Sequence, residues 1–430
     1  MKYYSLNKKA KEVSFKDAVI KGLADDKGLY FPEKITPLSK SFFENIDTLS
    51  DVEIAFEAIK QFVTPEIPEG ILKNIIEETL CFDFPIVSLS KNISTQELFH
   101  GPTMAFKDVG ARFMARCLGY FNRGNTNQVT VLVATSGDTG AAVANGFLGV
   151  KDVNVVILYP SKKVSDIQEK QITSLGQNIS ALEVQGTFDD CQAMVKNAFL
   201  DKDITKKTQL TSANSINVAR WLPQMFYFFF AYKKLYKTHK DIVFSVPSGN
   251  FGNVCAGMMA QQLGLPVKHF IAANNDNNVV TRYLKTQLYA PVKSVQTISN
   301  AMDVGDPSNF IRIQEIYKNK FDSLQKNLSS YSFNNNQTRK AMFDIYTKHD
   351  YVADPHGAVG YLGCKAYVEK NTRAHCVFLE TAHPTKFLNV VEDVVKIKQD
   401  LPKQIQAVIA NKKVATTISN YSDLKAFLLL

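Results

Sequence analysis

The sequence predicts an α/β fold in which helices cover both faces of a parallel sheet. From about residue 96 onward, short β-rich apolar runs alternate with segments of helical periodicity. This alternation is typical of parallel sheets with helical crossovers. Several of the runs also lead directly into turns rich in Gly, Ser, Asn and Thr before the next helix begins. In open α/β sheets such turns lie at the carboxyl ends of the strands, where ligands bind.

The elements are expected in the following order. Residues 1–95 are punctuated by proline and glycine, so we expect an irregular, partly helical region with helices over Val52–Phe62 and Ile71–Leu80. The strands that we expect beyond it are Val129–Ala134, Val153–Tyr159, Ile179–Val184, Ile242–Val246, Val267–Ala272 and Cys376–Leu379. The helices that we expect between them are Asp108–Tyr120, Thr139–Leu148, Ser165–Leu175, Val254–Leu263 and His356–Val368. Residues 301–350 are polar and poor in strand signal, which predicts helices and connecting loops.

The bulk composition is that of a globular protein larger than one typical domain. The chain has 430 residues, of which 45% are hydrophobic and 21% are charged. No apolar stretch is long enough to span a bilayer, and the N-terminus lacks the apolar region of a secretory signal. We therefore expect a cytoplasmic protein with no membrane attachment.

Cysteine, histidine and charge patterns argue against two further classes of site. The six cysteines show no C-x-x-C spacing and the seven histidines show no paired metal spacing, so we expect free thiols and no metal. The net charge is +9, but the lysines are spread along the chain and no aromatic-basic module accompanies them. We expect no nucleic-acid partner. A positive field would instead help to attract a phosphorylated substrate.

The first segment with chemical potential is HGPTMAFKD, in which Lys107 immediately precedes a predicted helix. Most lysines are solvated charges, but Lys107 has the small and aromatic neighbours Met104, Ala105 and Phe106. Partial burial would lower the pKa of its amine and leave part of it neutral and nucleophilic. The residues alone therefore allow a lysine that forms a Schiff base.

Two further segments are glycine-bearing turns between a strand and a helix. In Ala134–Ala142 (ATSGDTGAA), backbone N–H groups at a helix N-terminus could bind an anion, and an ordinary cap by Asp138 or Thr139 explains the pattern equally well. In Ser245–Val254 (SVPSGNFGNV), two glycines three residues apart favour a phosphate cradle over a plain turn. The spacing matches neither a nucleotide P-loop nor a dinucleotide fingerprint.

The last two segments are ambiguous on local grounds. In TSANSINVAR, Asn214 and Ser215 precede an aromatic helix, and Arg220 could bind a phosphate with its two-pronged guanidinium. Helix capping with Arg220 on the surface is the simpler interpretation. In LETAHPTKF, Thr381 follows a predicted strand and could bond to a ligand atom, or it could belong to a structural turn.

Taken together and in this order, the motifs HGPTMAFKD, ATSGDTGAA, NSIN, VPSGNFGN and ETAHPTKF closely resemble those of the threonine synthases, in their longer microbial form. The resemblance covers nearly the whole chain, including VSFKDAVIKGL near the N-terminus and NAMDVGDPSN at residues 300–309. It implies pyridoxal 5′-phosphate (PLP) as the cofactor. It also implies PLP fold type II, the tryptophan-synthase-β-like fold, in which a smaller α/β domain is inserted into a larger one. The expected reaction converts O-phospho-L-homoserine and water into L-threonine and phosphate.

The resemblance also implies a role for individual residues. Lys107 matches the lysine that binds PLP covalently and then acts as the catalytic base. Thr381 matches the hydroxyl residue that faces the pyridine nitrogen. The loop expected to hold the cofactor phosphate is Gly249, Asn250, Phe251, Gly252 and Asn253. The residues expected to bind substrate are Thr135, Ser136 and Thr139 at its carboxylate and Asn214, Ser215 and Arg220 at its phosphate.

Asp138 departs from the wider pattern of this fold type. Many relatives carry an asparagine there, whose amide can donate to the phenolic oxygen O3′ of PLP. An ionised carboxylate would repel that oxygen. Asp138 is expected on the cofactor side of the pocket, where it either shares a proton with O3′ or turns away and contacts something else.

The resemblance divides the chain into three parts and leaves other activities to be separated. We expect an N-terminal region at 1–95, a catalytic region at 96–400 with its smaller subdomain at about 125–215, and a C-terminal helical tail at 401–430. The alternatives are a threonine or serine dehydratase, a lyase that releases phosphate without adding water, a non-catalytic PLP-binding homologue and a phosphate-binding module without PLP. We expect a monomer or a homodimer.

Overall fold

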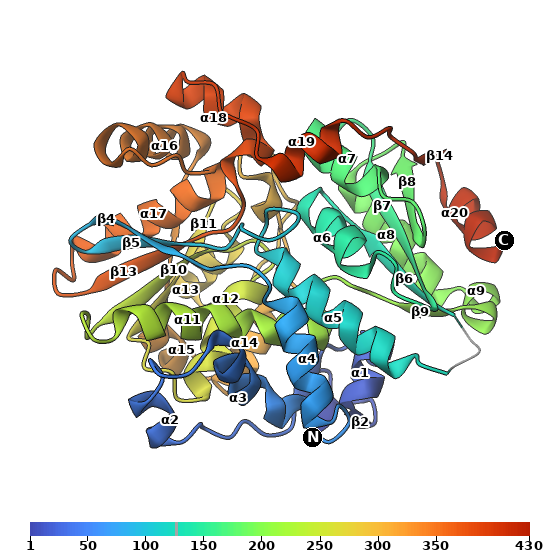
Figure 1. Ribbon diagram of the computed structural model, residues 1–430, viewed down its shortest axis with the longest axis horizontal. Helices are drawn as coiled ribbons and strands as arrows, with labels where there is room; N and C mark the ends of the chain where they lie inside the picture. The colour runs from blue at the N-terminus through green and yellow to red at the C-terminus, as the bar shows by residue number, and fades with distance from the viewer. Residues whose placement is uncertain (125–127) are drawn as a thin grey trace.

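The computed structural model describes residues 1–124 and 128–430. Within them, two mainly parallel sheets lie side by side, each with helices on both faces, and the N-terminal elements pack along one end of the pair (Figure 1). All six strands expected from the sequence are present, with ends that differ by no more than two residues.

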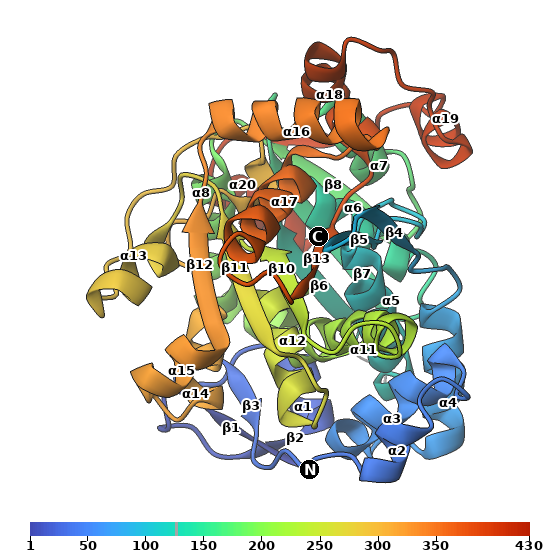
Figure 2. The ribbon, with the colours of Figure 1, turned by 90° about the vertical axis from the view of Figure 1, so that its left-hand side faces the viewer.

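The larger sheet has six strands in the order β12-β11-β10-β13-β5-β4, and only β4 and β5 pair antiparallel. Its strands are β4 (Ile86–Ser90), β5 (Ile93–Glu97), β10 (Ile242–Pro247), β11 (His269–Asn274), β12 (Leu328–Ser332) and β13 (His375–Glu380). Successive residues of β10 face opposite sides, as pleating requires. Phe244 packs with the buried residues of α11 (Phe226–Leu235) and α12 (Gly252–Gln262), and Val243 packs with those of α16 (Asn335–His349) and α17 (Pro355–Val368). Figure 2 shows these two pairs of helices on opposite sides of the sheet.

The smaller sheet has five parallel strands in the order β14-β8-β7-β6-β9. They are β6 (Val129–Ala134), β7 (Val153–Pro160), β8 (Ile179–Val184), β9 (Gln209–Thr211) and β14 (Thr416–Ile418). The helices on its two faces are α5 (Lys107–Phe121) and α6 (Asp138–Phe147) on one side and α8 (Phe188–Leu200) and α20 (Tyr421–Leu429) on the other. The segment expected as a helical tail thus also supplies an edge strand, β14, beside β8.

The N-terminal region contains a small antiparallel sheet that the sequence interpretation did not include, in the order β2-β1-β3. Its elements are β1 (Lys2–Ser5), β2 (Val13–Ser14), α1 (Phe15–Lys21), β3 (Tyr30–Pro32), α2 (Lys40–Glu44), α3 (Asp51–Val63) and α4 (Glu69–Thr79). The two expected helices are confirmed as α3 and α4. The first turn of α3 is fixed by a capping box between Ser50 and Glu53.

The remaining elements connect these layers. They are α7 (Asp166–Thr173), α9 (Lys202–Lys207), α10 (Val218–Trp221), η1 (Leu222–Met225), α13 (Val279–Thr286), η2 (Asn300–Met302), α14 (Phe310–Ile316), α15 (Phe321–Asn327), η3 (Pro384–Phe387), α18 (Leu388–Val395) and α19 (Lys403–Ile409). The expectation of helices and loops alone over 301–350 was wrong, because β12 lies there as an edge strand. Among the described residues, no helix is both long and apolar enough to cross a membrane.

Candidate active site

Backbone pairing brings Lys107 next to Thr381, although more than 270 residues separate them. The N–H of Phe106 donates to the carbonyl oxygen of Thr381 at 2.9 Å. Ala105 and Ala382 form an antiparallel bridge beside this bond. The first residue of α5 therefore lies at the carboxyl end of β13, where an α/β sheet binds its ligand.

The side chain of Lys107 is only 15% exposed. Burial lowers the pKa of its amine, the nearby carboxylate of Asp138 opposes this shift, and the cations Lys386 and Arg220 add to it. A lysine in these surroundings keeps more of its amine neutral at a given pH than a solvated lysine does. The environment expected from its apolar neighbours is present.

Asp138 contacts a residue that the sequence interpretation did not assign. Its Oδ1 lies 2.8 Å from Nζ of Lys386 and accepts a hydrogen bond from Nε2 of Gln168 at 2.9 Å. Its Oδ2 lies 3.9 Å from Nζ of Lys107. Burial alone would raise the pKa of Asp138, but Lys386 and Lys107 outweigh it and the pKa is lowered. Lys386 stands inside the quoted motif ETAHPTKF, so the motif pointed to the right segment.

The turn before α6 leaves several N–H groups open. The hydroxyl oxygen of Thr135 accepts the N–H of Gly137 and of Gly140, at 3.0 and 2.8 Å, and so supports the turn from inside. No described residue accepts a hydrogen bond from the N–H groups of Ser136, Asp138 and Thr139. Open N–H groups at a helix N-terminus suit a carboxylate or a phosphate.

The loop Gly249–Asn253 forms a second and larger set of open donors, at the start of α12. None of its five N–H groups bonds to a described residue, and Phe251 adopts a left-handed conformation with φ of 62°. A Cβ on Gly249 would lie 2.6 Å from Cα of Met302. Successive N–H groups around a left-handed residue form a concave anion site, so the loop has the form expected of a phosphate cradle.

Ser215 lies against this loop. Its hydroxyl oxygen accepts hydrogen bonds from Nδ2 of Asn250 at 2.7 Å and of Asn309 at 3.1 Å. Asn214 instead bonds to the carbonyl oxygen of Ala134, at the end of β6. The NSIN segment thus contacts both the predicted cradle and the smaller sheet.

Arg220 is buried rather than on the surface, with 3% of its area exposed. Its Nε and Nη1 have no partner among the described residues. Burial lowers the pKa of Arg220 to about 10. The side chain packs over Gly110, one helical turn from Lys107, where an added Cβ would lie 3.5 Å from Nε. A buried guanidinium with open donors is suited to an anion.

Arg312 is a second residue that the sequence interpretation missed, although it follows the quoted stretch NAMDVGDPSN. It is fully buried, and its guanidinium lies 4.4 Å from the centre of the Trp221 ring. It donates to the carbonyl oxygens of Ser215, Ile216 and Tyr30 at 3.1, 2.6 and 3.0 Å. It therefore ties the NSIN segment to the N-terminal sheet.

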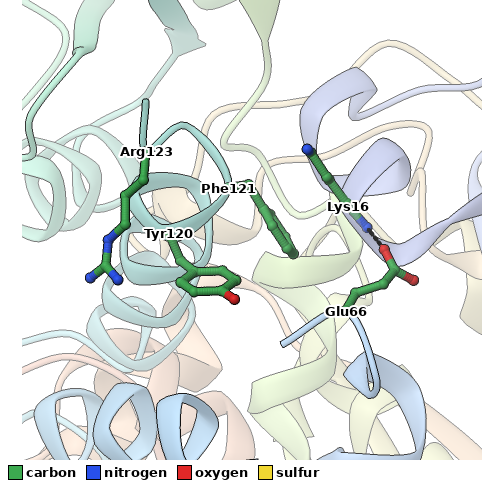
Figure 3. Close-up of a pocket in the computed structure, with 5 residues that line it drawn as sticks. All are labelled: Lys16, Glu66, Tyr120, Phe121 and Arg123. Atoms are coloured by element: carbon green, nitrogen blue, oxygen red, sulfur yellow. Dashed lines mark hydrogen bonds between the residues drawn. The ribbon is translucent and has the colours of Figure 1, made fainter. Parts of the chain in front are cut away.

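The described residues also contain a pocket away from this site, and they contain no cluster of metal ligands. The pocket drawn in Figure 3 is lined by Lys16, Glu66, Tyr120, Phe121 and Arg123, and Tyr120 stands at the opposite end of α5 from Lys107. Across residues 1–124 and 128–430, no three His, Cys, Asp or Glu side chains are grouped so that they could hold a metal ion.

Family models match nearly the whole chain. Residues 2–80 match the model described as threonine synthase N terminus, residues 76–380 match pyridoxal-phosphate dependent enzyme, and residues 357–428 match threonine synthase, C-terminal. The chain is 44% identical to a threonine synthase of Buchnera aphidicola over the whole of both chains. It is 41% identical to that of Escherichia coli, with 94% of each chain covered.

Solved structures agree with these matches. The crystal structure of threonine synthase from Escherichia coli aligns with a TM-score of 0.94 at 39% identity, covering 100% of this chain and 99% of that one. A PLP-bound threonine synthase from Brucella melitensis aligns with a TM-score of 0.92 at 31% identity, covering 100% and 98%. The fold expected from the sequence is confirmed.

Proposed function

The chain belongs to the threonine synthase family of PLP-dependent enzymes, and on that premise we propose that it converts O-phospho-L-homoserine and water into L-threonine and phosphate. The observation that supports this proposal is that three features suited to PLP and a phosphorylated substrate occur in one site. They are the buried amine of Lys107, whose pKa burial lowers, the five N–H groups of Gly249–Asn253 that bond to no described residue, and the Nε and Nη1 of Arg220, which have no partner among the described residues.

The residues present fit PLP. Five N–H groups of Gly249–Asn253 have no bond to a described residue, and a phosphate would supply acceptors for them. Lys107 offers a buried amine for the aldehyde, and Thr381 offers a hydroxyl that bonds to no described side chain. When bound, PLP supplies an electron sink that lets protons leave Cα and Cβ and lets phosphate leave Cγ.

Lys107 has two roles in this proposal. Its amine would hold the cofactor through the aldehyde carbon. When the substrate amine replaces it there, the freed Lys107 would serve as the base that removes the proton from Cα. The lowered pKa suits this second role, because a base must be unprotonated when it acts. The Thr381 hydroxyl, unlike a carboxylate, does not hold a pyridine nitrogen protonated.

The carboxylate and the phosphate of the substrate are assigned to different hydrogen-bond donors. We assign its carboxylate to the turn of Thr135, Ser136 and Thr139, where N–H groups are open at the start of α6. We assign its phosphate to Asn214, Ser215 and Arg220. Arg220 would stabilise the negative charge that grows on the departing phosphate. The buried position of Arg220 strengthens this contact, because few water molecules compete for the guanidinium.

The synthase and lyase activities differ in whether water is added at Cβ of the substrate. A threonine synthase adds water at Cβ, whereas a lyase would release phosphate and give 2-oxobutyrate and ammonia. The purified enzyme should therefore be incubated with O-phospho-L-homoserine while threonine and inorganic phosphate are measured together. We expect equal amounts of both. Production of 2-oxobutyrate with ammonia, or no turnover by protein loaded with PLP, would sink the proposal.

Two variants test the roles of Lys107 and Arg220 in the same assay. Lys107→Ala should lose the visible absorbance of the bound cofactor and all turnover. Arg220→Met should raise the KM for the substrate by roughly tenfold or more while the cofactor still binds, since a charge-assisted hydrogen bond is worth about 1.5–3 kcal/mol. Arg373→Met, at an exposed position, serves as the matched control. Equal loss of substrate and cofactor binding in folded Arg220→Met would remove the substrate-phosphate role.

The proposal also includes a cytoplasmic location and a monomer or homodimer. Cell fractionation and light scattering after size-exclusion chromatography test these two points.

A further inference from the structure

Lys386 is buried beside the proposed site and is assigned no part in it so far. Its side chain has 0% exposure and that of Asp138 has 4%. Nζ of Lys386 lies 2.8 Å from Oδ1 of Asp138 and donates to the carbonyl oxygen of Thr103, also at 2.8 Å. Gln168 donates a hydrogen bond to the same carboxylate oxygen. The pair is therefore fixed in place without help from solvent.

The pair lies within reach of the reactive amine. Oδ2 of Asp138 is 3.9 Å from Nζ of Lys107. The charged groups that act on Lys107 are Asp138, Lys386, Arg220 and, at the start of α17, Asp354. Asp138 and Asp354 favour its protonated form, and Lys386 and Arg220 disfavour it. Removing either Lys386 or Asp138 would therefore shift the pKa of Lys107.

The phenolic oxygen of PLP would lie close to the ion pair of Lys386 and Asp138. PLP carries an acidic phenolic oxygen next to its aldehyde carbon, so a lysine that binds the aldehyde also lies close to that oxygen. An unpaired carboxylate beside Lys107 would repel the ionised oxygen. An ammonium group has three protons, and Lys386 uses two of them on Asp138 and Thr103. The third bonds to no described residue and is available to an anionic oxygen.

We propose that Lys386 is a positioning residue, which neutralises Asp138 and offers its remaining N–H to the phenolic oxygen of the cofactor beside Lys107. This inference rests on the proposed function, because it assumes that PLP is bound through Lys107. It answers the question raised by a carboxylate in the turn at Asp138. The carboxylate does not face the cofactor alone, because it is one half of a neutral ion pair.

The test uses the full-length enzyme, from which PLP is removed and then added back. The rate of PLP capture, followed by the growth of the visible band, is measured against pH, and its midpoint reports the free amine of Lys107. Lys386→Met leaves Asp138 unpaired, so the midpoint should rise by roughly one unit or more. Asp138→Asn leaves Lys386 unpaired, so the midpoint should fall by a similar amount. The double variant should return to within about half a unit of the original.

Controls separate this role from a purely structural one. Lys386→Arg keeps the charge and should keep the midpoint. Lys413→Met removes another ion pair, in which Nζ lies 2.7 Å from Glu169 and 2.9 Å from Glu183, and should reduce stability without moving the midpoint. If Lys386→Met does not fold, Lys386→Gln, which also removes the charge, tests the same predicted rise.

The outcomes also distinguish this inference from the proposed function. Shifts of the same sign in both single variants, or an unchanged midpoint, would overturn the role of Lys386 while leaving the reaction intact. A wild-type protein that captures no PLP at any pH would overturn both. Opposite shifts that cancel in the double variant are the expected result.

Discussion

The hydroxyl of Ser215 lies where the predicted cofactor loop meets the predicted substrate segment. It accepts the side-chain amides of Asn250 and Asn309, so Ser215→Ala leaves both donors without this acceptor. A fully buried donor left without a partner costs about 1–3 kcal/mol. The lower end applies here, because both contacts are partly buried and Nδ2 of Asn309 also donates to the carbonyl oxygen of Asn250 at 3.2 Å. We expect a loss of unfolding free energy at that lower end and roughly tenfold weaker PLP binding, which corresponds to about 1.4 kcal/mol. Thermal unfolding and titration with PLP measure the two effects.

Ser174→Ala provides the matched control. The hydroxyl of Ser174 is buried without a partner among the described residues, so its removal breaks no hydrogen bond. We expect the stability to stay within about 0.5 kcal/mol of the original, as for most substitutions that touch no special feature. If Ser215→Ala behaved like Ser174→Ala in both measurements, the contact would have no energetic role.

Individual site residues differ in how far the sequence revealed them. Lys107 and Thr381 were proposed as site residues because they stand in distinctive motifs next to predicted element ends. Lys386 and Arg312 were not, because a cation in a loop or at a helix start is usually solvated. Their burial results from distant contacts, such as that of Arg312 with the carbonyl oxygen of Tyr30, and local pattern does not contain such contacts.

At the scale of elements, α17 approaches β13 so closely that only glycine fits at their contact. A Cβ on Gly357 would lie 1.6 Å from Oε2 of Glu380, which is fully buried. Burial, and next the nearby carboxylate of Asp354, raises the pKa of Glu380 well above its usual range. Gly357→Ala must therefore displace either the helix or a buried acid. We expect it to cost roughly 3 kcal/mol, the upper end for overpacking, measured by denaturant unfolding.

Gly70→Ala is the corresponding control within a helix. Gly70 lies in the first turn of α4, is exposed, and an added Cβ would meet nothing within 4 Å. Alanine is favoured over glycine in helices, so this variant should gain up to about 1 kcal/mol. A Gly357→Ala protein as stable as the original would show that α17 can move away from β13 without cost.

The apolar strands β6 and β8 were predicted, whereas the polar strand β12 was missed. The confirmed strands β6 and β8 are rich in Val, Ile, Leu and Ala and are buried. β12 reads LSSYS and lies at a sheet edge, and Ser330 bonds to the carbonyl oxygen of Ala272 and to Oδ1 of Asn274. Such a strand has the composition of a turn, because its stability comes from a neighbouring strand rather than from its own apolar pattern.

Across the whole molecule, the sequence predicted the class of fold but not how distant segments complete each sheet. The alternation of strands and helices predicted parallel sheets correctly. It could not show that residues 416–418 extend the smaller sheet, or that residues 93–97 pair with β13 in the larger one. Three-residue strands and polar strands acquire their conformation from the partner they meet, and the partner here is far away in the chain. The boundaries expected at 95, 125–215 and 401 therefore stay predictions.

Stability of the whole molecule should depend on pH through a histidine at the start of β13. Burial, and next the neighbouring His239, lowers the pKa of His375 to about 4. The His375 ring stacks on His239 at 3.6 Å, and its Nδ1 is buried without a partner among the described residues. Its Nε2 lies 3.0 Å from the hydroxyl of Ser94. Burial and the neighbouring His239 disfavour the charged ring, and a backbone contact at Lys91 only partly offsets them.

Because the folded pKa of His375 lies below the unfolded value of about 6.5, its contribution is present above pH 6.5 and is lost as the pH falls toward 4. The loss amounts to on the order of 3 kcal/mol, at 1.36 kcal/mol per pKa unit. Denaturant unfolding at pH 7 and pH 4.5 measures it. His375→Gln should reduce the difference between the two pH values, since glutamine keeps a polar contact with Ser94 and does not titrate. His349→Gln, at a partly exposed position on α16, should leave the difference unchanged. If His375→Gln retained the full pH dependence, the acid sensitivity would originate elsewhere in the fold.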